Sequence, residues 1–280
     1  MNDQPAPQSL SELDIEVLRP DCRRGEFRAV IFDFDGTLSL IRRNWPGVMI
    51  PMMVEVLQAT GTSESHDDLC AHVEEFVMRL NGKQTIYQML QLVDEVKARG
   101  AAPREALQYK DEYHLRLWEQ MRHRVEGLMS GEIEAETLTV PGSHRLLEQL
   151  RRRGVTLYLA SGTDLKYVQD EARALRLDQF FGDHIYAALD DYQNFSKQMI
   201  IERIIHDTGV AGHQLLGFGD GYVEIEEVRR AGGLAIGVAS DEQRREGVNA
   251  WKRNRLIRAG ADVIIGDYQQ QDALLDWLGI

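Results

Sequence analysis

The chain has 280 residues, of which 43% are hydrophobic and 28% charged, and its formal net charge is −13. This composition is typical of a globular protein with one large or two smaller domains, and the negative charge argues against non-specific binding to nucleic acid. Two cysteines are too few for a disulfide framework, and no apolar run approaches the roughly 18 residues of a membrane helix. Residues 1–20 lack the apolar core of a signal peptide. We therefore expect a cytoplasmic protein without membrane or nucleic-acid partners.

Residues 1–26 are expected to form an N-terminal extension. Within them, Leu13–Val17 alternates apolar and acidic side chains, which favours an edge strand beside the main sheet. The short apolar run Ala29–Phe32 is rich in β-branched and aromatic residues and predicts a buried strand. Asp33 and Asp35 follow directly, so two carboxylates stand at the carboxyl end of this strand.

Asp33 and Asp35 are the first candidate site residues. Carboxylates held this close repel each other unless a proton or a cation lies between them. Mg²⁺ prefers hard oxygen ligands, and open α/β sheets bind ligands at the carboxyl ends of their strands. The structural alternative is an acidic turn that leaves the strand, because Asp and Gly are common in turns. A buried strand that ends in two acids favours the Mg²⁺ site.

Residues 39–137 contain no convincing strand and are too many for a loop in a compact fold. Apolar residues at helical spacing predict four helices, over Val48–Ala59, Asp67–Leu80, Thr85–Ala98 and Arg104–Arg124. Ser65 and Thr85 are candidate N-caps, and Gly100 is a candidate helix end. We therefore expect an inserted all-helical domain.

Residues 27–38 and 138–280 are expected to form one core domain. Strands and helices alternate after residue 140, which predicts a Rossmann-like α/β fold with a mostly parallel sheet and helices on both faces. The predicted strands are Val155–Ala160, Ile185–Leu189, Leu215–Gly219, Leu234–Ala239 and Val263–Ile265. The predicted helices are Ser143–Arg153, Leu165–Leu175, Lys197–Thr208, Glu224–Ala231 and Gln270–Leu278.

Two of these element ends carry residues that suit a phosphate group. Ser161 and Gly162 follow a predicted strand and offer a hydroxyl and an unhindered backbone N–H, although a simple helix N-cap is the alternative. Lys197 lies in the first turn of a predicted helix, where its charge opposes the helix dipole. This position favours a cation that balances Asp33 and binds phosphate, and a solvated lysine is the alternative.

A second predicted strand also ends in acids. Asp220 comes directly after Leu215–Gly219, and Glu224 follows four residues later. Both are candidate metal ligands. Three roles stay open for Glu224: direct contact with the metal, contact through water, or support of Lys197.

These stretches resemble the four motifs of the haloacid dehalogenase-like hydrolase superfamily. Asp33–Thr37 reads DFDGT and is similar to the first motif, while Ser161 and Lys197 match the second and third. Asp220 and Glu224 match the fourth, in which Glu224 replaces an aspartate. The resemblance covers residues 28–38 and 140–280, and the predicted helices stand where the superfamily carries its first type of cap domain, between motifs one and two.

The resemblance implies a Mg²⁺-dependent phosphatase that forms an aspartyl-phosphate. Asp33 would be the nucleophile and Asp35 the general acid and base. In the superfamily, an aspartate at the position of Asp35 is shared by phosphatases and phosphomutases and is absent from dehalogenases. The metal would be held by Asp33, the backbone carbonyl of Asp35 and Asp220, with Glu224 in the outer shell. Lys197 would offset the negative charge near Asp33.

The remaining candidates contact the substrate. The resemblance implies that Ser161 and Gly162 bind the phosphoryl group, while Arg42, Arg43 and Lys83 are candidates at the entrance, each with the alternative of a solvated surface cation. A helical cap leaves little room for a macromolecule, so we expect a small phosphorylated metabolite. A phosphomutase and a non-catalytic phosphate-binding homologue are the alternatives, and the sequence predicts no oligomeric state.

Overall fold

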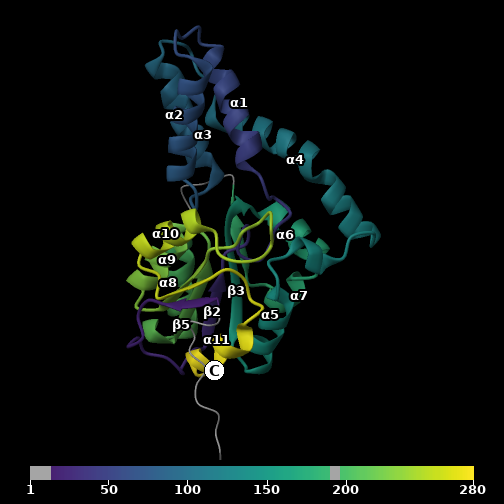
Figure 1. Ribbon diagram of the computed structural model, residues 1–280, viewed down its shortest axis with the longest axis vertical. Helices are drawn as coiled ribbons and strands as arrows, with labels where there is room; N and C mark the ends of the chain where they lie inside the picture. The colour runs from purple at the N-terminus through teal and green to yellow at the C-terminus, as the bar shows by residue number, and fades with distance from the viewer. Residues whose placement is uncertain (1–13, 190–195) are drawn as a thin grey trace, which may run out of the picture.

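A single sheet organises the described part of the chain, residues 14–189 and 196–280 of a computed structural model (Figure 1). Its strand order is β1-β7-β6-β5-β2-β3-β4. The strands are β1 (Ile15–Val17), β2 (Ala29–Phe32), β3 (Thr156–Asp164), β4 (Ile185–Ala188), β5 (Leu215–Gly219), β6 (Leu234–Val238) and β7 (Val263–Ile265). The strand β2 lies between β5 and β3, so the carboxyl ends of these three strands adjoin.

The pairing confirms the predicted mostly parallel sheet. β2 pairs in parallel with both neighbours, with Ala29 opposite Thr156 on one side and Leu215 on the other. β1 alone runs antiparallel, against β7, with Ile15 opposite Ile265. The predicted edge strand is therefore confirmed over Ile15–Val17, while Asp14 precedes the strand and Leu13 lies outside the described residues.

Helices cover both faces of the sheet, as the apolar runs predicted. They are α5 (Ser143–Arg152), α6 (Leu165–Ala174), α7 (Asp178–Phe181), α8 (Lys197–Thr208), α9 (Tyr222–Arg230), α10 (Ala250–Arg258) and α11 (Gln271–Leu278). Side chains of β2 alternate between two buried clusters, because successive strand residues point to opposite faces. Phe32 stacks on Phe218 with 4.7 Å between ring centroids, and Ile31 belongs to the other cluster. Helices α7 and α10 were not predicted.

Four helices form a separate layer beyond one end of the sheet (Figure 1). They are α1 (Pro46–Gln58), α2 (His66–Arg79), α3 (Thr85–Ala98) and α4 (Ala106–Ser130), here called the helical insert. The Ser65 side chain accepts from the backbone N–H of Asp68, which confirms this N-cap. The N-cap prediction for Thr85 is wrong, because Gln84 holds that position and Thr85 is the first helical residue. The domain boundaries at residues 38 and 138 stay a prediction.

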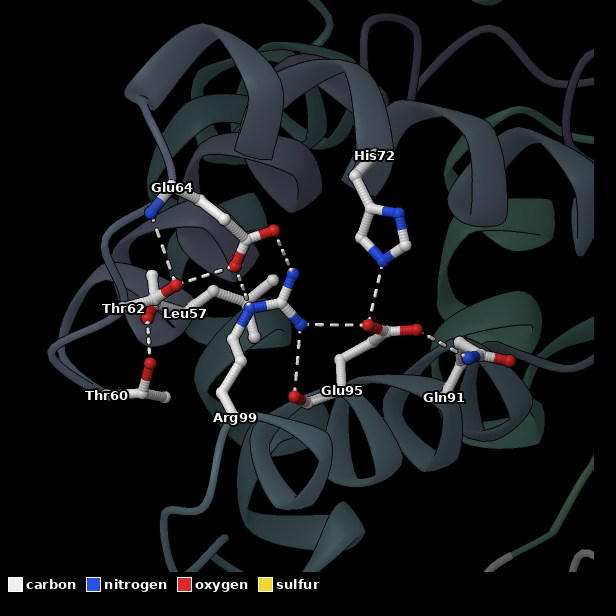
Figure 2. Close-up of polar contacts among 8 residues, drawn as sticks. All are labelled: Leu57, Thr60, Thr62, Glu64, His72, Gln91, Glu95 and Arg99. Atoms are coloured by element: carbon white, nitrogen blue, oxygen red, sulfur yellow. Dashed lines mark hydrogen bonds and ion pairs between the residues drawn. The ribbon is translucent and has the colours of Figure 1, made fainter.

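Polar contacts tie together the tip of the helical insert (Figure 2). The Arg99 guanidinium lies 2.6 Å from Glu64 in the α1–α2 loop and 2.9 Å from Glu95 on its own helix. Glu95 also lies 2.7 Å from His72 of α2. This cluster is far from the sheet, and its charges are paired with one another, so we assign it a structural role in joining α2, α3 and the loop.

The helical insert contacts the core in two places, through its two connecting segments and through the end of α2. The two connecting segments run side by side, with Leu40 N–H donating to the Leu138 carbonyl at 2.8 Å. On the opposite side, Arg255 of α10 donates to the carbonyls of Met78, Arg79 and Asn81 at the end of α2. Carbonyls at a helix C-terminus carry partial negative charge, so a guanidinium is a favourable partner there. No helix within the described residues is long and apolar enough to cross a membrane.

We predict that Arg255→Ala loosens the loop after α2. The variant loses charge-assisted hydrogen bonds to three carbonyls, so backbone amides of residues 81–84 should exchange with solvent about 10-fold faster. Hydrogen exchange measured by mass spectrometry checks this. Arg258→Ala is the matched control, because Arg258 is an exposed arginine one turn further along α10. Equal exchange in Arg255→Ala and the wild type would contradict the prediction.

Candidate active site

Four segments distant in sequence meet at the carboxyl ends of β2, β3 and β5. Asp33 directly follows β2, Asp220 follows β5, and Thr163 lies near the end of β3. Lys197 begins α8, and Glu224 lies in the first turn of α9. Parallel pairing places these ends at one edge of the sheet, because strand β2 is shared by both neighbours.

A buried ammonium joins two of these carboxylates. Lys197 Nζ lies 2.6 Å from Asp33 Oδ1 and also contacts Glu224 Oε1. All three residues are buried, so each charge depends on the others for compensation. The predicted pairing of Lys197 with Asp33 is confirmed. Glu224 contacts Lys197, which is one of the three roles left open for it, and its roles toward a metal stay predictions.

The carboxylate of Asp33 is held in a strongly negative environment. Burial raises its pKa, the nearby Asp220 raises it further, and Lys197 opposes both effects. Thr37 Oγ1 accepts from the Asp220 backbone N–H at 3.0 Å and donates to Asp33 Oδ2 at 3.5 Å, so it links the ends of β2 and β5. Gly36 has φ +73°, and a Cβ there would collide with the Asp220 carboxylate. Only glycine suits both the backbone conformation and this close approach.

Asp35 is oriented by two different contacts. Thr163 Oγ1 donates to its Oδ2 at 2.8 Å, while Arg42 Nε lies 3.9 Å from its Oδ1. The same guanidinium forms a bidentate pair with Glu171 of α6, with Arg42 Nη2 2.6 Å from Glu171 Oε1. Burial raises the pKa of Asp35 to about 7; Arg42 lowers it, and Glu171 and Asp33 raise it. Asp35 Oδ1 is buried and has no hydrogen-bond partner in the described chain.

A second lysine, absent from the sequence-based candidates, holds Asp220. Lys252 Nζ of α10 lies 2.8 Å from Asp220 Oδ2 and 2.7 Å from Glu242 Oε1. It also donates to Ser240 Oγ at 3.2 Å, and Ser240 donates to the Gly36 carbonyl at 2.6 Å. Burial lowers the pKa of Lys252, but the two carboxylates outweigh burial and raise it above its usual value. Sequence reasoning missed Lys252 because α10 has a weak apolar pattern.

A cavity of about 80 Å³ separates this edge of the sheet from the helical insert. Its walls include most of the candidates, namely Asp33, Asp35, Arg42, Arg43, Lys83, Gly162, Lys197 and Asp220. Arg42 is buried in its pair with Glu171, so the alternative of a solvated cation does not hold for it. Ser161 is not part of the wall; its Oγ accepts from the Thr163 backbone N–H at 3.1 Å, and Thr163 lines the cavity in its place. Phosphate binding by Ser161 stays a prediction.

The oxygen atoms at this edge fit a small hard cation. Asp220 is close enough to Asp33 to raise its pKa, and the Asp220 carboxylate lies against Gly36, the residue that follows Asp35. Across the described ranges, no three acidic, histidine or cysteine side chains form a metal-binding group by themselves. Mg²⁺ in proteins is commonly held by one or two carboxylates together with other oxygen ligands and water, so two carboxylates and a backbone carbonyl suffice.

The sequence profile of the haloacid dehalogenase-like hydrolases matches residues 27–232. The chain belongs to this family. The family assignment accounts for the order of the four motifs along the chain and for their convergence at one edge of the sheet. No curated protein matches the chain.

Solved structures show the same fold in other members of the family. A predicted phosphoglycolate phosphatase from Haemophilus somnus is 17% identical, with a TM-score of 0.58 over 89% of this chain and 98% of that one. A haloacid dehalogenase-like protein of unknown function from Agrobacterium tumefaciens is 21% identical, with a TM-score of 0.59 over 91% and 100%. The β-phosphoglucomutase of Clostridium difficile is 14% identical, with a TM-score of 0.59 over 90% and 97%.

We predict that Lys197→Met destabilises the metal-free protein. The change leaves Asp33 and Glu224 buried without their cation, which should lower the free energy of unfolding by about 3 kcal/mol at pH 7. The loss should shrink as the pH falls to 5, because a folded-state carboxyl with a raised pKa binds a proton and loses its charge. Urea denaturation followed by circular dichroism, with EDTA present, measures both values.

The control for this variant is Lys97→Met, which changes an exposed lysine on α3 and should alter stability by less than about 0.5 kcal/mol. A second variant, Lys197→Met with Glu224→Gln, should recover part of the loss because it removes one of the two uncompensated charges. Stability of Lys197→Met equal to that of the wild type at pH 7 would show that the ammonium does not compensate these carboxylates.

Proposed function

We propose that this protein is a Mg²⁺-dependent phosphatase that hydrolyses a small phosphate monoester through an aspartyl-phosphate. The observation that carries the proposal is the pair Asp33 and Asp35 in one cavity wall, where Asp33 contacts Lys197 and Asp35 contacts Thr163. Asp33 is paired with Lys197, which favours its ionised form. Asp35 has a pKa of about 7, which suits a group that gives and takes a proton at neutral pH.

In the first step Asp33 attacks the phosphorus atom of the substrate. A bond forms between the Asp33 carboxylate and phosphorus, and the bond between phosphorus and the leaving oxygen breaks. Asp35 gives its proton to that oxygen, so the product leaves as an alcohol. Thr163 holds Asp35 Oδ2, and Oδ1 is the oxygen without a hydrogen-bond partner in the described chain, so we assign the proton transfer to Oδ1.

In the second step water hydrolyses the aspartyl-phosphate. Asp35, now ionised, takes a proton from the water molecule while the water oxygen attacks phosphorus. The bond between phosphorus and the Asp33 oxygen breaks, which releases inorganic phosphate and restores both carboxyl groups to their starting states. Lys197 keeps Asp33 in place through both steps, because its other partner, Glu224, is fixed on α9.

The residues that would hold Mg²⁺ are Asp33, Asp220 and the backbone carbonyl of Asp35. A bound Mg²⁺ would lower the repulsion between the carboxylates and the phosphate and stabilise charge on the phosphoryl oxygens. Lys252 holds Asp220 Oδ2 at 2.8 Å, which leaves the other carboxylate oxygen of Asp220 for the metal. Glu224 is engaged with Lys197, so we place it outside the ligand set.

The size of the cavity supports a small substrate. A cavity of about 80 Å³ lies between the core and the helical insert, which acts as a cap in this proposal. Two structures with this fold are named a predicted phosphoglycolate phosphatase and a β-phosphoglucomutase, and both names specify small phosphorylated compounds. Cys22 and Cys70 are free, which supports a reducing, cytoplasmic location.

We predict that the protein releases inorganic phosphate from small phosphate monoesters and that Asp33→Asn abolishes the release. Asp35→Asn should lower kcat by about 100-fold or more, because it removes the general acid and base. EDTA should stop turnover and excess Mg²⁺ should restore it. A colorimetric phosphate assay over a panel of sugar, nucleotide and short-chain phosphates measures all three effects.

The matched control is Asp183→Asn, which changes an exposed aspartate that also follows a glycine but lies before β4. Its activity should equal that of the wild type. Turnover that survives EDTA or Asp33→Asn would overturn the proposal. Isomerised sugar phosphate as the main product, with little free phosphate, would identify a phosphomutase.

A further inference from the structure

The cations in the cavity wall fall into two groups, those paired with acids and those without a carboxylate partner. Lys197 is paired with Asp33 and Glu224, and Arg42 is paired with Glu171. Two other cations in the wall have no such compensation. Within the described ranges, neither Arg43 nor Lys83 has a carboxylate oxygen within 4.0 Å, although the chain has a formal net charge of −13.

Arg43 lies in a group of arginines rather than beside an acid. Arg124 of α4 donates to the carbonyls of Ile41 and Arg43, at 2.6 and 3.2 Å. Arg245 donates to the Glu136 carbonyl at 2.6 Å. Burial lowers the pKa of Arg124 and Arg245, and the charge of Arg43 lowers both further.

The Nε atoms of Arg124 and Arg245 are buried without a hydrogen-bond partner in the described chain. Both side chains contact backbone carbonyls rather than carboxylates, so they add to the positive potential at Arg43 instead of reducing it. A wall with uncompensated arginine charge favours an anion in the adjacent cavity.

Lys83 reaches the same cavity from the helical insert. It lies in the loop between α2 and α3, which sits directly on the core: a Cβ placed on Gly162 would be 3.0 Å from the Lys83 carbonyl oxygen. Its ammonium lies 5.8 Å from the centroid of the Tyr87 ring of α3. Arg43 and Lys83 therefore come from two different parts of the fold and line one cavity with Asp33.

We propose that the leaving group of the substrate carries a second anionic group, a carboxylate or a phosphate, which Arg43 and Lys83 bind while the first phosphate faces Asp33. This inference rests on the proposed phosphatase function and names its substrate class. Charge-assisted hydrogen bonds to such a group would compensate both cations. A neutral leaving group of equal size leaves them uncompensated, so the site should discriminate between the two.

Matched substrate pairs test the proposal. Phosphoglycolate and ethyl phosphate have nearly the same size but differ by one carboxylate, and ethylene glycol bisphosphate supplies a second phosphate in its place. The wild type should show a kcat/KM at least about 10-fold higher for one or both of the doubly anionic substrates than for ethyl phosphate, equivalent to roughly 1.4 kcal/mol. The two anionic substrates together show which oxyanion is preferred.

Arg43→Gln and Lys83→Gln should each lower kcat/KM for the preferred anionic substrate by about 10-fold, mainly through KM, and change ethyl phosphate hydrolysis by less than about 2-fold. Arg122→Gln on α4 and Lys97→Gln on α3 are matched controls, because both cations are exposed and lie 3.9 and 3.5 Å from acids on their own helices. Both controls should equal the wild type with every substrate.

The outcomes separate this inference from the proposed function. Equal hydrolysis of ethyl phosphate and both anionic substrates, or equal losses on all of them in the variants, overturns the inference while the phosphatase stands. Full turnover in Asp33→Asn, or no phosphate release at all, overturns the proposed function. In that second case, calorimetry measures the binding of phosphoglycolate and ethyl phosphate instead of their turnover. Equal affinities of the wild type for the two compounds would overturn the anion site. An unchanged phosphoglycolate affinity in Arg43→Gln would overturn it as well.

Discussion

A buried ammonium between two buried carboxylates is the interaction on which the rest of this site depends. Lys197 joins Asp33 at the end of β2 to Glu224 on α9, so three segments far apart in sequence must be correctly placed before any of their charges is compensated. Loss of one partner leaves the others charged and desolvated, a state that costs several kcal/mol. The ion triad therefore links the folding of the core to the orientation of Asp33.

The same principle accounts for the other charged residues around Asp33. Lys252 compensates Asp220 and Glu242, and the Arg42–Glu171 pair bounds the position of Asp35. Acids that would repel one another in an unconstrained chain are thus held close together, and burial, together with this closeness, raises the pKa of Asp33 and of Asp35.

Much of the fold and part of the site could be predicted from local sequence. Strands β5 and β7 and helices α3 and α8 begin and end where the apolar pattern placed them, because a buried strand reads as a continuous apolar run and a helix as a periodic one. Asp33, Asp220 and Lys197 were found because each interrupts such a pattern at its end. The Thr85 N-cap was wrong because a threonine before an apolar run fits either the cap or the first helical turn.

The residues that sequence reasoning missed are those whose roles depend on distant partners. Glu171 lies 129 positions from Arg42, and nothing near either residue indicates the other. Lys252 lies in α10, where basic side chains are as numerous as apolar ones, so burial of its ammonium follows from tertiary packing alone. Thr163 replaced Ser161 in the cavity wall because β3 extends to Asp164 with a shift in register, which a prediction ending the strand at Ala160 could not include.

Two glycines beside the catalytic motifs connect the chemistry to the helical insert. A Cβ on Gly162 would lie 3.0 Å from the Lys83 carbonyl oxygen, and a Cβ on Gly221 would lie 3.0 Å from the Cα of Gly82. Backbone can approach backbone this closely only where side chains are absent. Gly162 and Gly221 directly follow Ser161 and Asp220, so the segments that carry these two candidates also form the surface on which the α2–α3 loop rests. The backbone of Lys83 is therefore placed by the same segments that carry the candidate site residues. In the proposed mechanism, this backbone contact would couple recognition of the leaving group to the geometry around Asp33.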